Sequence, residues 1–335
     1  MKKVSILGAG AWGMALSGLL TDNGHQVTLW EPDSKRAALL HKDREDPARL
    51  PGVVIPYEVE IVSKLEKGVE SKDLIGLAAP SHFMREVAKK LASSGLGDAI
   101  LLNFSKGLEN QTLCRMSEIL TQELPQKNHS NICTLSGPSF AVEVSRKIST
   151  SVVIAGKDES IARQAQSILM NQYFRVYTSP DIIGVELGGA LKNVIAIASG
   201  ICDGMGMGDN TRGALITRGL AEMTRLGEKM GAQARTLSGL SGMGDLIATC
   251  TSKHSRNRHV GEEIAKGKKL EQILSEMVMV AEGVKTTQSA FQLASKFSVE
   301  MPITEQVYKI LYEGKNPQEA LRDLMTRQPK AEVWN

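Results

Sequence analysis

A single lysine in an apolar run is the first residue whose position suggests chemistry. Residues 182–200 form an apolar stretch without proline, which is typical of a helix buried on most sides. Lys192 is the only cation in this run, and lysine is rarely buried unless another group pairs with it. The residues on its helical face are small, namely Gly188, Gly189, Ala196 and Ser199. We therefore expect open space for a ligand in front of a catalytic lysine. The alternative is a lysine that extends its ammonium to solvent.

A second group of reactive residue types lies about fifty residues further on. Asp245 follows two glycines in the sequence SGMGDL and is either a helix N-cap or a functional carboxylate. Residues 249–258 (TCTSKHSRNR) place hydroxyls, arginine and asparagine at a predicted helix start. Free N–H groups, the helix dipole and a guanidinium favour phosphate there, with a solvated basic turn as the alternative. His254 and His259 lack zinc-ligand spacing, so we predict no metal site.

The amino-terminal residues carry a dinucleotide-binding pattern. A short β-rich run at 3–7 ends in GAGAWG, and a helical pattern follows to about residue 21. Gly8 permits a tight turn, Gly10 lets the backbone approach the pyrophosphate, and Gly13 lets the helix pack closely on the strand. The first helical turn, with Ala11 and Trp12, then offers its free N–H groups to the phosphates.

Glu31 ends the second predicted strand, residues 26–30, where a carboxylate can accept hydrogen bonds from the adenosine ribose. It would repel a 2′-phosphate, so NAD is favoured over NADP. Lys35 and Arg36 are close enough to weaken that preference, and a solvated acid at a helix start is the alternative.

The elements that position these residues follow from hydrophobic patterning. Strands alternating with helices predict a mostly parallel, doubly wound α/β sheet, whose ligands gather at the strand carboxyl ends. Lys106 follows one of these strands and would face the cofactor pocket. The further predicted strands are 74–79, 99–104, 131–135, 151–155 and 174–177, and the helices between them include 82–91, 112–123 and 160–170.

After residue 180 strand-like runs vanish and helical patterns continue to about residue 324. We predict a dinucleotide-binding domain at 1–180, a helical substrate and catalytic domain at 181–326, and a tail at 327–335. The run at 182–200 is long enough to span a bilayer but carries Glu186 and Lys192, so we expect a core helix instead of a membrane span.

Composition narrows the class of protein. The 335 residues include 31 glycines, 14 methionines and only 4% aromatics, which fits an α/β enzyme. The formal net charge of +3 comes from interspersed charges, so no nucleic-acid partner is predicted. The four cysteines form no CxxC pair, and the amino terminus does not read as a secretory signal, so we expect a cytoplasmic protein. Dinucleotide, phosphate site and lysine together predict a dehydrogenase of a small phosphorylated alcohol or ketone.

At this point the chain resembles the bacterial type of NAD(P)-dependent glycerol-3-phosphate dehydrogenase over nearly its whole length. The motifs that carry this resemblance, beside GAGAWG, are SKGLE at 105–109, SGPSFA at 136–141, GVELGGALKNVIAIASGICDGMGMGDNTRGALITRGLAEM at 184–223, GMGDLIATCTSKHSRNR at 242–258, VAEG at 280–283 and MPITEQVY at 301–308. The resemblance implies reversible reduction of dihydroxyacetone phosphate to sn-glycerol 3-phosphate for phospholipid synthesis, in a homodimer.

The resemblance also implies roles for individual residues. Lys192 would donate and accept the proton at the C2 oxygen, while Lys106 would contact both substrate and cofactor. The remaining substrate-site positions would be Gly137, Ser139, Asp245, Ser255, Arg256 and Asn257. We expect Asn193, next to Lys192, to lie in the same site. Further cofactor contacts would come from Ala11, Trp12, Ala141, Arg256, Val280 and Glu282.

One departure concerns the cofactor. Many relatives carry arginine or histidine just past the second strand, whereas this chain has Glu31-Pro32, which argues against NADP. The alternatives to this function are a β-hydroxyacid dehydrogenase, which also pairs a dinucleotide domain with a catalytic lysine, and a non-catalytic dinucleotide-sensing module. The Ser255-Arg256-Asn257 block and the GDN motif at 208–210 argue against the former.

Overall fold

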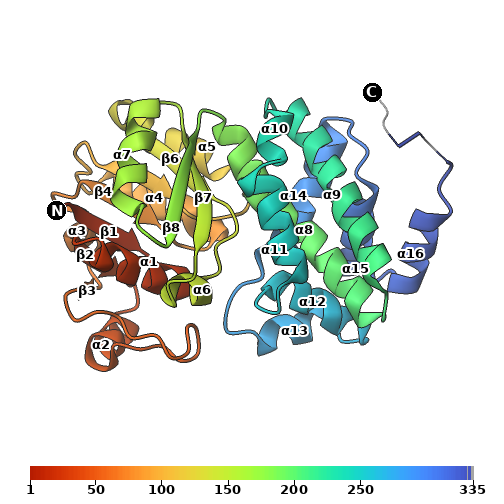
Figure 1. Ribbon diagram of the computed structural model, residues 1–335, viewed down its shortest axis with the longest axis horizontal. Coiled ribbons are helices and arrows are strands. Elements are labelled where there is room, and N and C mark those ends of the chain that lie inside the picture. The colour runs from red at the N-terminus through yellow and green to blue at the C-terminus, as the bar shows by residue number, and fades with distance from the viewer. Residues whose placement is uncertain (330, 333–335) are drawn as a thin grey trace.

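The computed structural model describes residues 1–329, 331 and 332. It has two lobes side by side (Figure 1): a sheet lobe, built from all the strands and the helices packed on them, and a helical lobe. The predicted tail at 327–335 lies partly outside the described residues. The last strand ends at Ser179 and the first helix of the helical lobe begins at Ile182. The domain bounds themselves stay a prediction.

The sheet lobe is organised around one eight-stranded sheet in the order β3-β2-β1-β4-β5-β6-β7-β8. All neighbouring strands are parallel except β6 and β7, which are antiparallel. The chain reverses its strand order between β1 and β4, and ligands of open α/β sheets bind at such a point. The strands are β1 (Lys3–Leu7), β2 (Gln26–Trp30), β3 (Glu60–Val62), β4 (Leu74–Leu77), β5 (Ile100–Asn103), β6 (Ile132–Ser136), β7 (Thr150–Gly156) and β8 (Phe174–Ser179).

The side chains of the strands contribute alternately to two apolar layers, because successive residues of a strand point to opposite faces of the sheet. Val4 and Ile6 pack under one group of helices, while Leu7 packs under the other. The first group is α1 (Ala11–Asp22), α6 (Ala141–Ser145) and α7 (Glu159–Leu169), seen in front of the sheet in Figure 1. The second is α3 (Leu65–Val69), α4 (Met84–Ala92) and α5 (Met116–Glu123). The connecting elements are α2 (Ser34–Asp43) and the short η1 (Ser81–Phe83) and η2 (Gln126–Asn131).

The helical lobe surrounds α8 (Ile182–Gly204), whose residues 184–201 are all buried. Its most apolar window is 94% buried, so this helix, although long enough to cross a membrane, is the core of the lobe. The other helices are α9 (Asp209–Lys229), α10 (Ala234–Leu237), the π-helical turn η3 (Leu240–Gly244), α11 (Asp245–Thr251), α12 (Arg256–Ala265), α13 (Leu270–Glu276), α14 (Glu282–Lys296), α15 (Pro302–Glu313) and α16 (Pro317–Met325).

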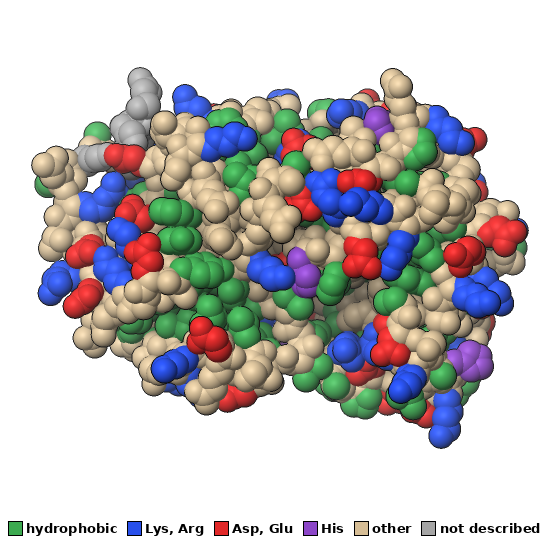
Figure 2. All heavy atoms as spheres, turned by 180° about the vertical axis from the view of Figure 1, so that it is seen from behind, with side chains coloured by type: hydrophobic (Ala, Val, Ile, Leu, Met, Phe, Trp, Pro, Cys, Tyr) green, Lys and Arg blue, Asp and Glu red, His purple; other side chains and the backbone are tan. Residues whose placement is uncertain are grey.

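The prediction of a doubly wound α/β lobe followed by a helical lobe is confirmed. All seven predicted strands are present, with ends that shift by up to two residues. The sequence analysis missed β3, which has only three residues and too short a pattern to detect. On the face seen in Figure 2, acidic and basic side chains are interspersed, as their alternation along the chain predicts.

Candidate active site

The Lys192 side chain lies in the middle of α8 and is buried, with 6% of the residue exposed. Its ammonium donates to Asp245 Oδ1 at 2.5 Å and to Thr249 Oγ1 at 2.7 Å. An ammonium carries three donors. Within the described part of the chain, the third N–H of Lys192 has no hydrogen-bond partner, so it is available to a substrate oxygen.

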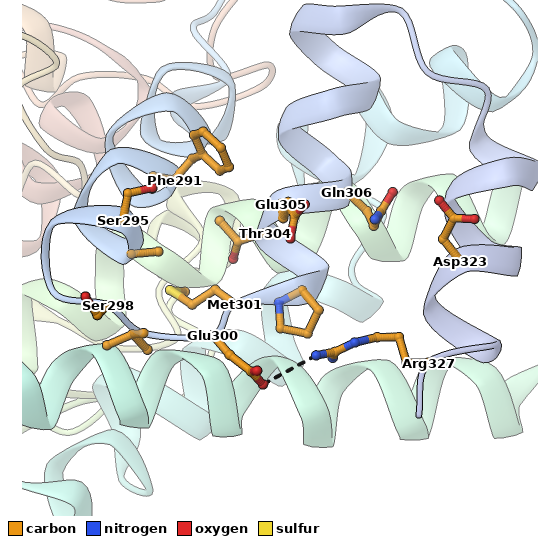
Figure 3. A pocket seen from close by; sticks show the side chains of 13 residues that line it. Phe291, Ser295, Ser298, Glu300, Met301, Thr304, Glu305, Gln306, Asp323 and Arg327 are labelled. Carbon is orange, nitrogen blue, oxygen red and sulfur yellow. Dashed lines mark hydrogen bonds and ion pairs between the residues drawn. The ribbon is translucent and has the colours of Figure 1, made fainter. Parts of the chain in front are cut away.

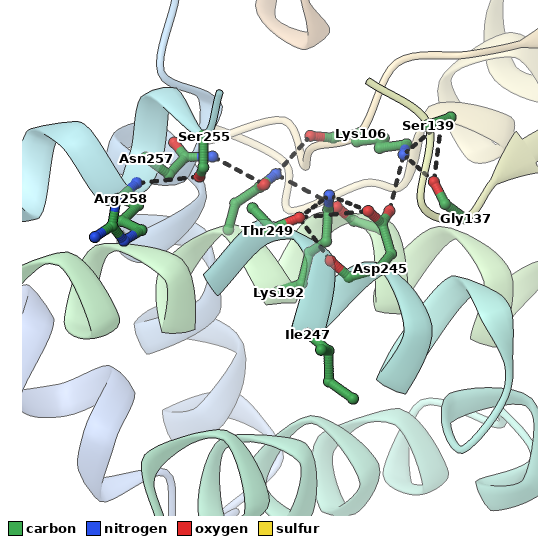
Figure 4. Close-up of polar contacts among 12 residues, drawn as sticks. Lys106, Gly137, Ser139, Lys192, Asp245, Ile247, Thr249, Ser255, Asn257 and Arg258 are labelled. Carbon is green, nitrogen blue, oxygen red and sulfur yellow. Dashed lines mark hydrogen bonds and ion pairs between the residues drawn. The ribbon is translucent and has the colours of Figure 1, made fainter. Parts of the chain in front are cut away.

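Asp245 joins two lysines that are far apart in the sequence. Its Oδ2 accepts a hydrogen bond from Lys106 Nζ at 2.8 Å, while Oδ1 accepts from Lys192. Figure 4 shows the two ammonium groups converging on this carboxylate. Lys106 follows β5 and also donates to the carbonyl of Gly137 at 2.8 Å, with Ser139 Oγ 3.5 Å away. Asp245 is the first residue of α11, and its side chain binds the two lysines. Of the two alternatives for Asp245, the structure therefore favours a functional carboxylate over a helix N-cap.

The ionisation of this cluster is perturbed in a direction useful for catalysis. Burial lowers the pKa of Lys192 to about 8, although the negative charge of Asp245 opposes this shift and the positive charge of Lys106 adds to it. Asp245 is also fully buried, which disfavours its charge, but Lys106 and Lys192 hold its pKa below the usual value. The Asp245 carboxylate lies between two lysines, and one of them, Lys192, has a pKa close to neutral pH. This arrangement is suited to proton transfer.

The small residues beside Lys192 do not leave the open space that the sequence analysis expected. A Cβ on Gly188 would lie 2.5 Å from the carbonyl oxygen of Ser241, and one on Gly189 would lie 2.5 Å from Ser136 Oγ. Ser199 donates its hydroxyl to the carbonyl of Cys250. The expectation was wrong because α11, η3 and the end of β6 pack directly onto this face. The glycines permit that close approach.

Two asparagines connect the helices around the cluster. Asn193 Nδ2 lies 3.3 Å from the carbonyl of Lys106, and its Oδ1 accepts from Asn257 Nδ2 at 2.9 Å. Asn257 Oδ1 in turn accepts the backbone N–H of Gly283 at 2.9 Å. Both asparagines are buried. This chain of amides fixes α8, α12 and the start of α14 against the loop that carries Lys106.

The predicted phosphate site is the amino terminus of α12. Ser255 caps this helix by accepting the N–H of Arg258 at 3.2 Å. Arg256 is exposed and donates to the carbonyl of Val280. Within the residues that the structure describes, no hydrogen bond joins Arg256 to the lysine cluster. Its guanidinium is therefore accessible at a helix end that favours anions.

The glycine loop after β1 fits a dinucleotide. Gly8 has φ +120°, and a Cβ there would lie 2.9 Å from the backbone of Ala78 at the end of β4. A Cβ on Gly13 would lie 1.9 Å from the oxygen of Gly8, whereas nothing lies within 4 Å of one on Gly10. The hydrogen-bond ladder of α1 starts at Met14, so the N–H groups of the preceding residues of this helix have no intrahelical partner and are available to an anion. The open side at Gly10 is the space that a pyrophosphate needs.

Three further predicted cofactor residues lie at the ends of secondary-structure elements in the two lobes. Glu31 directly follows β2, is 6% exposed and pairs with Arg36. Glu282 begins α14 and reaches across to the sheet lobe, where it accepts the Ser81 N–H at 3.0 Å and the Ser81 hydroxyl at 2.5 Å. Ala141 begins α6, which packs on α1.

The sequence analysis missed one residue of the cluster. Thr249 accepts from Lys192 and donates its own hydroxyl to the carbonyl of Asp245 at 2.6 Å. It lies four residues after Asp245, which places both on one face of α11. That spacing was readable once Asp245 was taken as functional.

A separate hollow of about 540 Å³ lies between α14, α15 and α16 (Figure 3). None of its lining residues is a predicted site residue. Glu300 and Arg327 form an ion pair at its edge. Among the described residues, no group of histidine, cysteine and acidic side chains could hold a metal ion.

A glycine loop at the strand-order reversal, together with a buried lysine whose pKa is about 8, is typical of nicotinamide-dependent oxidoreductases. Two family models match the chain: the amino-terminal domain of NAD-dependent glycerol-3-phosphate dehydrogenase matches residues 3–162, and its carboxyl-terminal domain matches residues 181–322.

Individual proteins give the same result. The chain is 51% identical to glycerol-3-phosphate dehydrogenase [NAD(P)+] of Syntrophotalea carbinolica over 98% of this chain and 99% of that protein. It is 49% identical to that of Pelotomaculum thermopropionicum, covering 97% and 93%. The crystal structure of glycerol-3-phosphate dehydrogenase from Coxiella burnetii superimposes with a TM-score of 0.92 at 35% identity, covering 97% and 99%. The chain belongs to the NAD(P)-dependent glycerol-3-phosphate dehydrogenase family.

Proposed function

We propose that the protein interconverts dihydroxyacetone phosphate and sn-glycerol 3-phosphate, with Lys192 as the proton donor and acceptor. The observation that carries this proposal is the Lys192–Asp245–Lys106 cluster, in which a buried ammonium keeps one donor free. The names of the relatives supply the substrate and the cofactor pair NAD or NADP.

In the direction of reduction, protonated Lys192 donates its free N–H to the carbonyl oxygen at C2 and transfers the proton as that oxygen becomes anionic. A bound reduced nicotinamide supplies the hydride that C2 accepts. Asp245 stabilises the ammonium before the transfer, and Lys106 adds positive charge beside the developing oxyanion. Oxidation needs the neutral amine, which a pKa of about 8 makes accessible near neutral pH.

The phosphate of the substrate binds at the amino terminus of α12. Arg256 supplies a guanidinium fork, and the backbone N–H groups at the helix start supply further donors. The Asn193–Asn257 chain holds this helix against α8. The packing of α12 along α8 then sets the distance between the Lys192 ammonium and the phosphate-binding helix start.

Replacing Lys192 by methionine tests the proposal, because methionine keeps much of the volume and removes the proton. We expect kcat to fall about 10²- to 10⁴-fold, the usual contribution of a general acid–base group. NADH binding, followed by tryptophan fluorescence, should be unchanged. Lys229→Met, an exposed lysine at the end of α9, is the matched control and should keep full activity. Near-normal turnover of Lys192→Met would refute the assignment.

The same assay separates the alternative functions. A dinucleotide-sensing module would bind NADH without any turnover of dihydroxyacetone phosphate. A β-hydroxyacid dehydrogenase would oxidise a 3-hydroxy acid without a phosphate and leave glycerol 3-phosphate unchanged. The free N–H of Lys192 and the anion-favouring start of α12 support the phosphorylated substrate.

We further propose that the enzyme acts in the cytoplasm as a homodimer and that its product feeds phospholipid synthesis. The four widely spaced free cysteines support a reducing compartment, and the burial of α8 within the protein argues against a membrane span. Analytical ultracentrifugation of the purified chain tests the dimer, and a single species of monomer mass at micromolar concentration would contradict it.

A further inference from the structure

The guanidinium of Arg36 joins three segments at the end of β2. Its Nη1 donates to the carboxylate of Glu31, and its Nη2 donates to the carbonyl of Ala9 at 2.6 Å. Nη2 also donates to Asp46 Oδ2 at 2.8 Å, and Nε lies 3.3 Å from the same oxygen. Four of its five N–H donors are therefore engaged, two of them with Asp46.

This arrangement lies where the adenosine ribose of a dinucleotide binds. Ala9 is part of the glycine loop, and Glu31 occupies the position whose carboxylate accepts hydrogen bonds from the ribose in NAD-binding sheets. In NADP-binding relatives of this fold, a nearby arginine accommodates the 2′-phosphate. This chain has both residue types in direct contact, so neither Glu31 nor Arg36 alone decides the preference.

Asp46 supplies the additional charge. It lies in the loop after α2, its side chain is 11% exposed, and it also accepts from Arg49 Nη1 at 2.9 Å. Burial disfavours its charge, but Arg36 and Arg49 hold the pKa of Asp46 below its usual value. Asp46 is thus a carboxylate at neutral pH, and Arg36 is shared between two carboxylates.

We propose that Asp46 is a specificity-determining residue that excludes the 2′-phosphate of NADP by occupying the guanidinium fork of Arg36. The fork formed by Nε and Nη2 is the geometry that binds a phosphate bidentately. While Asp46 holds it, an incoming 2′-phosphate meets two carboxylates and no free fork. Without the charge of Asp46, the fork is released, while Nη1 still neutralises Glu31. The inference rests on the proposed function only in taking the glycine loop as the dinucleotide site.

Adenosine 5′-monophosphate and adenosine 2′,5′-bisphosphate isolate this end of the cofactor, because they differ only in the 2′-phosphate. Isothermal titration calorimetry gives their dissociation constants for the wild type and for Asp46→Asn, which preserves the shape of the side chain. We expect Asp46→Asn to improve binding of the bisphosphate relative to the monophosphate at least tenfold. Glu45→Gln, the same loss of charge on an exposed neighbour, should change this ratio less than twofold.

Two further variants test the role of Arg36. In the double variant Arg36→Ala with Asp46→Asn, the gain should disappear, since no fork is left to release. In Arg49→Ala, Asp46 no longer shares its charge between two arginines and pairs with Arg36 alone. We therefore expect this variant to bind the bisphosphate more weakly. The ratio of kcat/KM for NADPH and NADH should follow the same order.

An unchanged ratio in Asp46→Asn, with both nucleotides still bound, would overturn the proposal. An equal gain in the double variant would also overturn it, because a gain without Arg36 reflects net charge alone. Failure of the proposed function looks different, since the wild type would then bind neither nucleotide. Should Asp46→Asn fail to fold, as judged by circular dichroism, Asp46→Ser makes the same comparison with and without Arg36, because it also removes the charge that holds the fork.

Discussion

Removing the charge of Asp245 should move the ionisation of Lys192. Burial and Lys106 both lower the pKa of Lys192, and Asp245, 2.5 Å from its ammonium, is the main group that raises it. An opposite charge at this range changes a pKa by roughly one to three. Each pKa unit corresponds to about 1.4 kcal/mol, so the variant Asp245→Asn loses about 1.4–4 kcal/mol of ammonium stabilisation. The pKa of Lys192 should therefore fall from about 8 to between about 5 and 7.

The assay is the pH dependence of kcat/KM in both directions. In the wild type, oxidation should rise with pH through a midpoint near 8, because it needs the neutral amine, and reduction should fall through the same region. In Asp245→Asn both midpoints should move down by roughly one to three pH units. The midpoint is the quantity to compare, because the overall equilibrium constant fixes the ratio of kcat/KM for oxidation to kcat/KM for reduction at any one pH.

Asp203→Asn is the matched control. Asp203 lies on the same helix as Lys192, and its similarly buried carboxylate pairs with Arg212 and Arg258. This variant should lose stability without moving the midpoint. If Asp245→Asn kept a midpoint near 8 while both rates fell equally, Asp245 would act only by positioning, and the electrostatic reasoning would be refuted.

Three further predictions follow from the geometry. Arg256→Ala should raise KM for dihydroxyacetone phosphate far more than for a phosphate-free analogue in steady-state kinetics, and equal losses would contradict a phosphate contact. Gly188→Ala should cost about 1–3 kcal/mol in urea unfolding and reduce kcat, because the new Cβ displaces the Ser241 backbone just before Asp245. Gly213→Ala, with open space around it, is the control and should be neutral or slightly stabilising. Burial raises the pKa of Glu222 to about 7, although hydrogen bonds from the N–H groups of Ile303 and Thr304 oppose this rise. The free energy of unfolding of the wild type therefore falls as the pH rises from about 4.5 to 7. The free energy of unfolding of Glu222→Gln, measured in urea relative to that of the wild type, should therefore increase by about 2–3 kcal/mol as the pH rises from 5 to 8. A difference that does not change with pH would contradict the raised pKa.

Features that depend on neighbours along the chain could be predicted from the amino-acid sequence. The glycine loop, the alternation of strands and helices, and the apolar helix around Lys192 are local patterns, because periodicity and backbone freedom act over a few residues. The family motifs added the identity of the substrate site. The isolated cation at Lys192 was sufficient to nominate the catalytic residue.

Which distant charges come into contact could not be predicted before the fold was known. Asp245 could have been a helix cap until packing of α11 on α8 placed it between Lys106 and Lys192. The space at Gly188 was assigned to a ligand until the backbone of η3 was found to fill it. Asp46 gave no signal in the sequence, because its effect depends on a loop folding back onto Arg36. Ionisation and specificity depend on distances in space, and no local pattern encodes these.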